Sequence, residues 1–130
     1  MALEDIPEMQ LMTRQNEQLQ LNSDTSYYAK FVEVNHKFSS RNYLFGHKGF
    51  SYHLDVMGYF MEQLKIKHGL KKDEISEFKS VGGGMIYLIN KEIKICDKSV
   101  RYGKYHLDII KPIIERYFLQ HLSNAKLIFE

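Results

Sequence analysis

Two stretches of the chain carry apolar residues at helical spacing. The first predicts an amphipathic helix over residues 52 to about 67, and Ser51 just before it is a residue type favoured at helix N-caps. The second predicts a helix over residues 105–122, which Pro112 should kink or split. The apolar positions that define the first helix are Leu54, Met57, Met61 and Leu64.

Between and around these helices, apolar and polar residues alternate as they do in half-buried strands. Asn90 and Lys91 form a tight turn that joins two of these strands into a β-hairpin. The order of elements is β, β, α, β, β, α, β, which predicts an α/β fold with a mixed β-sheet flanked by two helices. The predicted strands cover residues 30–35, 43–45, 85–89, 92–96 and 125–129.

The chain has 130 residues, a length that fits one domain. Residues 1–26 are polar with scattered Leu and Met and show no sustained period, so they predict a mobile N-terminal arm with, at most, one helical turn around residues 12–19. Residues 27–130 then make up the folded domain. No exposed heptad pattern forces association, so the expected state is a monomer.

Composition narrows the classes of function. The formal net charge is +2, which gives no basis for predicting a nucleic-acid partner. The single cysteine, Cys96, excludes an internal disulfide and a cysteine-based metal site. No apolar run approaches the ~20 residues that span a bilayer, and residues 1–20 lack the pattern of a secretory signal. The expected location is therefore cytoplasmic, without membrane contact.

His53 would lie in the first turn of the first predicted helix. The partial positive charge at a helix N-terminus disfavours imidazolium, so this side chain should be neutral at pH 7 and able to accept a proton. The free N–H groups of the same turn suit an anion such as phosphate. Considered by itself, however, an ordinary surface histidine near a helix start is the favoured interpretation.

Residues 99–101 follow a predicted strand and precede a helix, where successive backbone N–H groups form anion-binding turns. The Ser99 hydroxyl, the Val100 N–H and the Arg101 guanidinium would serve as donors to such an anion. Lys30, at the start of a strand, would neutralise its charge. The ordinary alternatives are a strand-to-helix loop and a solvated lysine.

Three segments, taken in order, resemble one family. They are residues 51–55 (Ser-Tyr-His-Leu-Asp), 81–84 (Val-Gly-Gly-Gly) and 98–103 (Lys-Ser-Val-Arg-Tyr-Gly). With Lys30 opening a strand, they are similar to the motifs of the janus/ocnus family of phosphohistidine phosphatases. The similarity in spacing covers roughly residues 30–129, and the glycine run would shape the sheet.

The resemblance implies a hydrolase that needs no metal and no other cofactor, and that acts on phosphohistidine, less strongly phospholysine, in a protein partner. It implies that His53 is the catalytic proton acceptor, and that Lys30, Ser99, Val100 and Arg101 bind the phosphate. Some members of the family are linked to sexual differentiation or to the male germline.

The sequence departs from the family at three positions. Met85 and Phe45 stand where the family typically has arginines, and Arg101 stands where it has a small residue. Arg101 would either replace the lost charge or block the pocket by its bulk. Two hypotheses follow: a working phosphatase with a rearranged anion site, or a diverged member that acts as a binding or regulatory protein.

Overall fold

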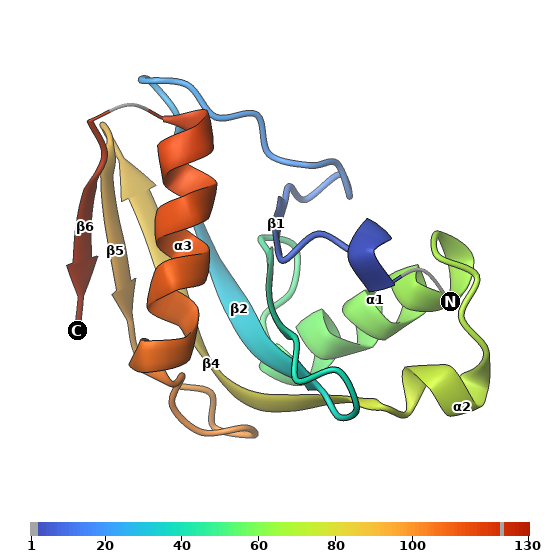
Figure 1. The fold of residues 1–130 in the computed structure, drawn as a ribbon. Helices are drawn as coiled ribbons and strands as arrows, with labels where there is room; N and C mark the ends of the chain where they lie inside the picture. Colours follow the sequence, from blue (N-terminus) through green and yellow to red (C-terminus); the bar gives the residue numbers. More distant parts are fainter. Residues whose placement is uncertain (1–2, 123) are drawn as a thin grey trace.

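Six strands form one mixed sheet in the order β1-β3-β2-β4-β5-β6, as seen in the computed structural model, which describes residues 3–122 and 124–130 (Figure 1). The pairs β1–β3 and β5–β6 are parallel, and the other neighbours are antiparallel. The strands are β1 Met9–Met12, β2 Ser26–His36, β3 Asn42–His47, β4 Phe78–Ile89, β5 Glu92–Cys96 and β6 Lys126–Phe129.

A long helix packs on each face of the sheet, and the middle parts of β2, β3 and β4 are buried on both faces. Helix α3, Leu107–His121, lies in front of the sheet in Figure 1 and packs with Phe31 and Ile86. Helix α1, His53–Ile66, packs on the opposite face with Val32 and Phe45. Neighbours in sequence thus enter different cores, as the alternation of side chains along a strand requires. The predicted single α/β domain, a mixed sheet flanked by two helices, is confirmed.

The N-terminal segment differs from the prediction of a mobile arm over residues 1–26. Strand β1 pairs with β3, and all four of its side chains are buried. Leu11 enters the core under α3, whereas Met12 enters the core under α1. A short strand buried on both faces shows no alternation, so the pattern of polar and apolar residues did not mark it. The prediction is wrong for residues 9–12, and no helical turn forms around residues 12–19.

The helices are close to their predicted bounds, with three differences. Tyr52, not Ser51, is the N-cap of α1, and no side chain caps this helix. Helix α3 is continuous through Pro112, so the predicted split does not occur. A short helix, α2, which the pattern did not predict, covers Lys72–Ile75. Within residues 3–122 and 124–130, no helix has the length and apolar character needed to cross a bilayer.

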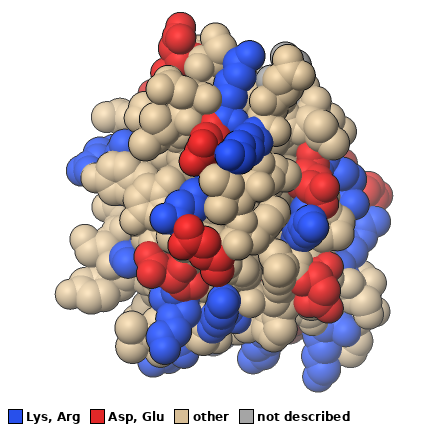
Figure 2. Space-filling view, turned by 90° about the vertical axis from the view of Figure 1, so that its left-hand side faces the viewer, with Lys and Arg blue, Asp and Glu red and all other residues tan. Residues whose placement is uncertain are grey.

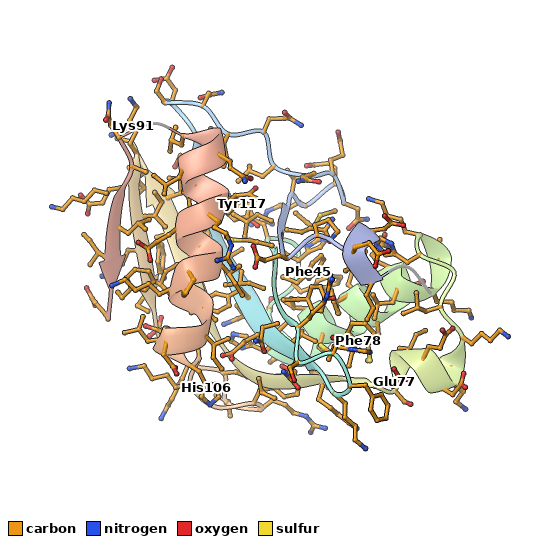
Figure 3. All side chains as sticks on the ribbon, viewed as in Figure 1. Phe45, Glu77, Phe78, Lys91, His106 and Tyr117 are labelled. Atoms are coloured by element: carbon orange, nitrogen blue, oxygen red, sulfur yellow. The ribbon has the colours of Figure 1, made fainter. Side chains whose placement is uncertain are left out.

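Strand β4 runs through the glycine segment and so begins well before the strand predicted for residues 85–89. Its pairing with β2 shifts between Glu33 and Val34, which lie opposite Gly82 and Ser80, so Val81 is an extra residue in a β-bulge. In Figure 3, Phe78 at the start of β4 and Phe45 of β3 belong to the core under α1, whereas Tyr117 belongs to the core under α3. The bulge therefore lies between Phe78, which belongs to the core under α1, and Ile86, which belongs to the core under α3.

Candidate functional site

His53 is the first residue of α1 and is nearly buried against the glycine segment of β4. Its Nε2 atom lies 3.0 Å from the carbonyl oxygen of Gly84. Because a carbonyl oxygen only accepts hydrogen bonds, Nε2 carries the hydrogen and donates. The other ring nitrogen, Nδ1, is then unprotonated in the neutral ring and is able to accept a proton.

The surroundings of His53 keep its imidazole neutral. Burial lowers the pKa of His53 from the ordinary value of 6.5, because the charged form loses solvation. The hydrogen bond to Gly84 opposes this shift, and the positive charge of Lys30 lowers the pKa further. A neutral imidazole at pH 7 is the state that a general base requires.

Gly83 makes room for the close packing of His53 and the loop that carries Ser99. A Cβ atom at Gly83 would lie 2.7 Å from the carbonyl oxygen of Phe31, 3.0 Å from Cδ2 of His53 and 3.2 Å from Cβ of Ser99. Both side chains therefore pack over one point of β4, where only glycine fits. On the other face of the strand, a Cβ at Gly82 would lie 2.7 Å from the Lys104 carbonyl oxygen, so the loop also crosses the sheet closely there.

The loop between β5 and α3 is closed by Ser99. Its N–H donates to the carbonyl oxygen of Gly103 (3.1 Å), the Gly103 N–H donates back (2.9 Å), and the Ser99 hydroxyl oxygen accepts from the Tyr102 N–H (2.9 Å). Gly103 has a φ of 85°, a left-handed conformation that favours glycine. Ser99 itself is buried, while Val100 and Arg101 at the tip of the turn are exposed.

These elements enclose a pocket of about 900 Å³ beside His53. Three cationic side chains, Lys30, Lys98 and Arg101, line it together with one carboxylate, Asp55. Their excess of positive charge favours an anion. The remaining lining residues are Ser51, Tyr52, His53, Leu54 and Val100.

Backbone donors are also available at the pocket. Among residues 3–122 and 124–130, the backbone N–H groups of four residues that line the pocket have no hydrogen-bond partner: His53, Leu54, Val100 and Arg101. The predicted anion-binding turn therefore offers fewer N–H donors than expected, because the Ser99 N–H already donates to the carbonyl oxygen of Gly103. The structure brings Lys30, His53, Val100 and Arg101 together around one space and places Ser99 behind it.

Met85 and Phe45, which stand where the resembled family has arginine, differ in location. Met85 lies opposite Lys30 in the sheet, with its sulfur atom 4.0 Å from the Lys30 ammonium nitrogen, so it lies next to one of the cations of the pocket. Phe45 is buried in the core under α1 and stacks on Tyr59. Only Met85 therefore bears directly on the charge around Lys30.

No family model matches this chain, and no curated protein matches it.

One hydrogen-bonded pair, Glu33 with His106, was not predicted from the sequence. Glu33 of β2 is fully buried, and its Oε1 accepts hydrogen bonds from the backbone N–H of His106 (2.8 Å) and from the His106 ring (3.1 Å). His106 precedes α3 and is labelled at the base of this helix in Figure 3. This contact holds the C-terminal end of the loop against β2. In the sequence, the only indication of a polar contact here was a glutamate within an otherwise apolar strand.

Charge on one face of the molecule is more evenly mixed than in the pocket. On the face shown in Figure 2, lysine and arginine side chains are interspersed with aspartate and glutamate. Among the residues that the structure describes, no group of three His, Cys, Asp or Glu side chains is placed to hold a metal ion. The pocket itself provides an unprotonated imidazole nitrogen, three cations and free N–H groups, which together suit the binding and hydrolysis of a phosphoryl group.

Proposed function

We propose that this chain is a cytoplasmic, metal-independent protein-histidine phosphatase of the janus/ocnus type, which hydrolyses phosphohistidine and, less strongly, phospholysine. The main support is the position of His53. Its ring donates to Gly84 through Nε2 and so keeps Nδ1 free to accept a proton, in the wall of a pocket lined by Lys30, Lys98 and Arg101. The ordered motifs of the sequence give independent support.

In the proposed reaction, Lys30, Arg101 and the free N–H groups of the pocket hold the phosphoryl oxygens. Nδ1 of His53 takes a proton from a water molecule as the water oxygen attacks phosphorus. The P–N bond breaks, and its electron pair stays on the nitrogen of the substrate imidazole. The protonated His53 returns its proton to that leaving nitrogen, which restores the neutral base.

The direct test is phosphate release from a peptide that contains phosphohistidine. We expect release well above spontaneous hydrolysis, unchanged by a metal chelator, and little release from the same peptide with phosphoserine. Release no faster than that of the peptide alone would contradict the proposal.

The charge of Lys30 should contribute, together with burial, to the position of the acidic limb of the pH–rate profile. Since the free base is active, kcat/KM falls as pH drops through the His53 pKa, which burial and Lys30 hold below 6.5. Replacing Lys30 with glutamine removes a positive charge, so the acidic limb should move to higher pH. Measuring kcat/KM against pH separates this shift from the weaker phosphate binding of the variant. An unmoved limb would show that Lys30 does not act on the titrating group.

The second hypothesis is a diverged member that binds a phosphoprotein or another partner without turnover, in sexual differentiation or the male germline. The observation in its favour is Met85, which places a thioether beside Lys30 at the position of a family arginine. High turnover by the wild-type protein would dismiss this hypothesis.

The variant Met85→Arg tests the charge at this position. The added guanidinium should strengthen the binding of a phosphate analogue such as vanadate about tenfold, as expected for one new charge-assisted hydrogen bond. Isothermal titration would measure the change, with Met61→Arg on the exposed side of α1 as the control. Turnover that is absent in the wild type and gained with Met85→Arg would favour the second hypothesis, and unchanged affinity would mean that the position does not reach the anion.

A further inference from the structure

Large apolar side chains stand exposed around the mouth of the His53 pocket. The exposed fractions are 71% for Tyr52, 50% for Leu54 and 100% for Val100. The first two belong to the start of α1 and the third to the loop before α3, yet all three line the same pocket. We name these three residues the apolar collar.

A single exposed apolar side chain needs no explanation, but a group of them around a polar pocket suggests a binding surface. The cations in the pocket account for the capture of a phosphoryl group, and a free phosphate ion would gain nothing from the apolar collar. A polypeptide that carries the phosphoryl group would gain, because its neighbouring residues could cover the three side chains.

We propose that the apolar collar binds the residues on either side of the phosphohistidine in a protein substrate, with a preference for bulky apolar side chains there. This inference rests on the proposed function of the pocket. Charge complementarity fixes the orientation, because the cations hold the phosphoryl group inside the pocket. Since His53 is nearly buried, the substrate backbone must come down to the mouth of the pocket, and its flanking side chains then lie against Tyr52, Leu54 and Val100.

Binding of two peptides tests the preference without requiring turnover. Both carry a non-hydrolysable analogue of phosphohistidine, flanked on each side by leucine in one peptide and by serine in the other. The wild-type protein should bind the leucine peptide about tenfold more tightly, a difference that corresponds to the burial of about one leucine side chain, shared between the two flanking residues. Fluorescence anisotropy measures both dissociation constants.

Variants of the apolar collar should reduce this preference. We expect the tenfold ratio to fall to about threefold in Leu54→Ser and in Val100→Ser, since each removes one apolar contact. Val100 is fully exposed, so its replacement does not disturb the core. The matched control is Leu119→Ser, because Leu119 is 74% exposed on α3, the helix on the other face of the sheet, and its loss should leave the ratio unchanged.

The outcomes separate the two proposals. Equal binding of both peptides, binding of neither, or a ratio that persists in both collar variants would overturn the role of the apolar collar. If the protein releases phosphate from phosphohistidine but binds both peptides equally, the phosphatase proposal is supported and the proposed role of the apolar collar is wrong. If the protein prefers the leucine peptide but releases no phosphate, the role of the apolar collar is supported and the phosphatase proposal is wrong.

Discussion

Replacement of His53 with alanine should slow phosphate release from a phosphohistidine peptide by about 10²- to 10⁴-fold, the usual effect of losing a general base. The loss should fall on kcat, because Lys30 and Arg101 remain to hold the phosphoryl group. Steady-state kinetics with the phosphohistidine peptide would measure it. Turnover close to that of the wild type would remove His53 from the mechanism.

Two further variants separate chemistry from folding. His53→Gln keeps an N–H group that can donate to the Gly84 carbonyl oxygen but offers no base, so it should be as inactive as the alanine variant and closer to the wild type in stability. His68, partly buried after the end of α1, gives the control variant His68→Ala, which should keep its activity. Loss of activity in His68→Ala would show that the assay reports stability and not the loss of a base.

Replacement of Gly83 with alanine should damage both the fold and the site. The new Cβ would lie 2.7 Å from a backbone oxygen of β2 and would press on His53 and Ser99. A backbone atom of the central sheet has little freedom to move, so we expect a loss of about 1–3 kcal/mol in the free energy of unfolding. Because the methyl group separates His53 from the loop, phosphate release should also fall by at least tenfold. Urea denaturation and the phosphatase assay would measure the two effects.

Gly58 is the matched control for this substitution. It lies exposed within α1, and no atom stands within 4 Å of the position of its Cβ. Gly58→Ala should therefore raise the free energy of unfolding by about 0.5–1 kcal/mol, because alanine has the higher helix propensity. Equal stability of Gly83→Ala and the wild type would mean that the sheet yields at this point and that the glycine is not required.

The sequence pattern was sufficient where an element has one buried face. The hairpin strand Glu92–Cys96 follows from its alternation. The helix His53–Ile66 follows from its helical spacing, but its buried face was predicted only in part: Leu54 and Met61 are exposed, and Val56 and Phe60 are buried instead. Strand β1 was missed because its four residues are buried on both faces and have no period. The N-cap at Ser51 was a local inference, and local preference did not decide where α1 begins.

For the site, the sequence indicated which residues are involved but not their geometry. His53, Lys30, Val100 and Arg101 line one pocket, although they come from three separate elements. No pattern in the sequence could show that Ser99 turns inward to close its own loop, because this depends on the hydrogen bonds with Gly103. The contact of Glu33 with His106 was hidden for the same reason, since the two residues are 73 positions apart.

The bulge at Val81 determines which face of the sheet each later side chain of β4 points to. Ser80 lies on the α1 side of the sheet, and after the extra residue Gly83 and Met85 lie on that side as well. Ile86 and Leu88 therefore point into the core under α3. Deletion of Val81 would exchange the two faces for the residues that follow. Ile86 and Leu88 would leave the core under α3, and Gly83 would no longer lie beside His53. Among relatives of this chain, insertions and deletions should therefore be rare at Val81. They should be more common in the exposed hairpin loop around Asn90, because a change of loop length there is tolerated more easily than one inside a buried strand.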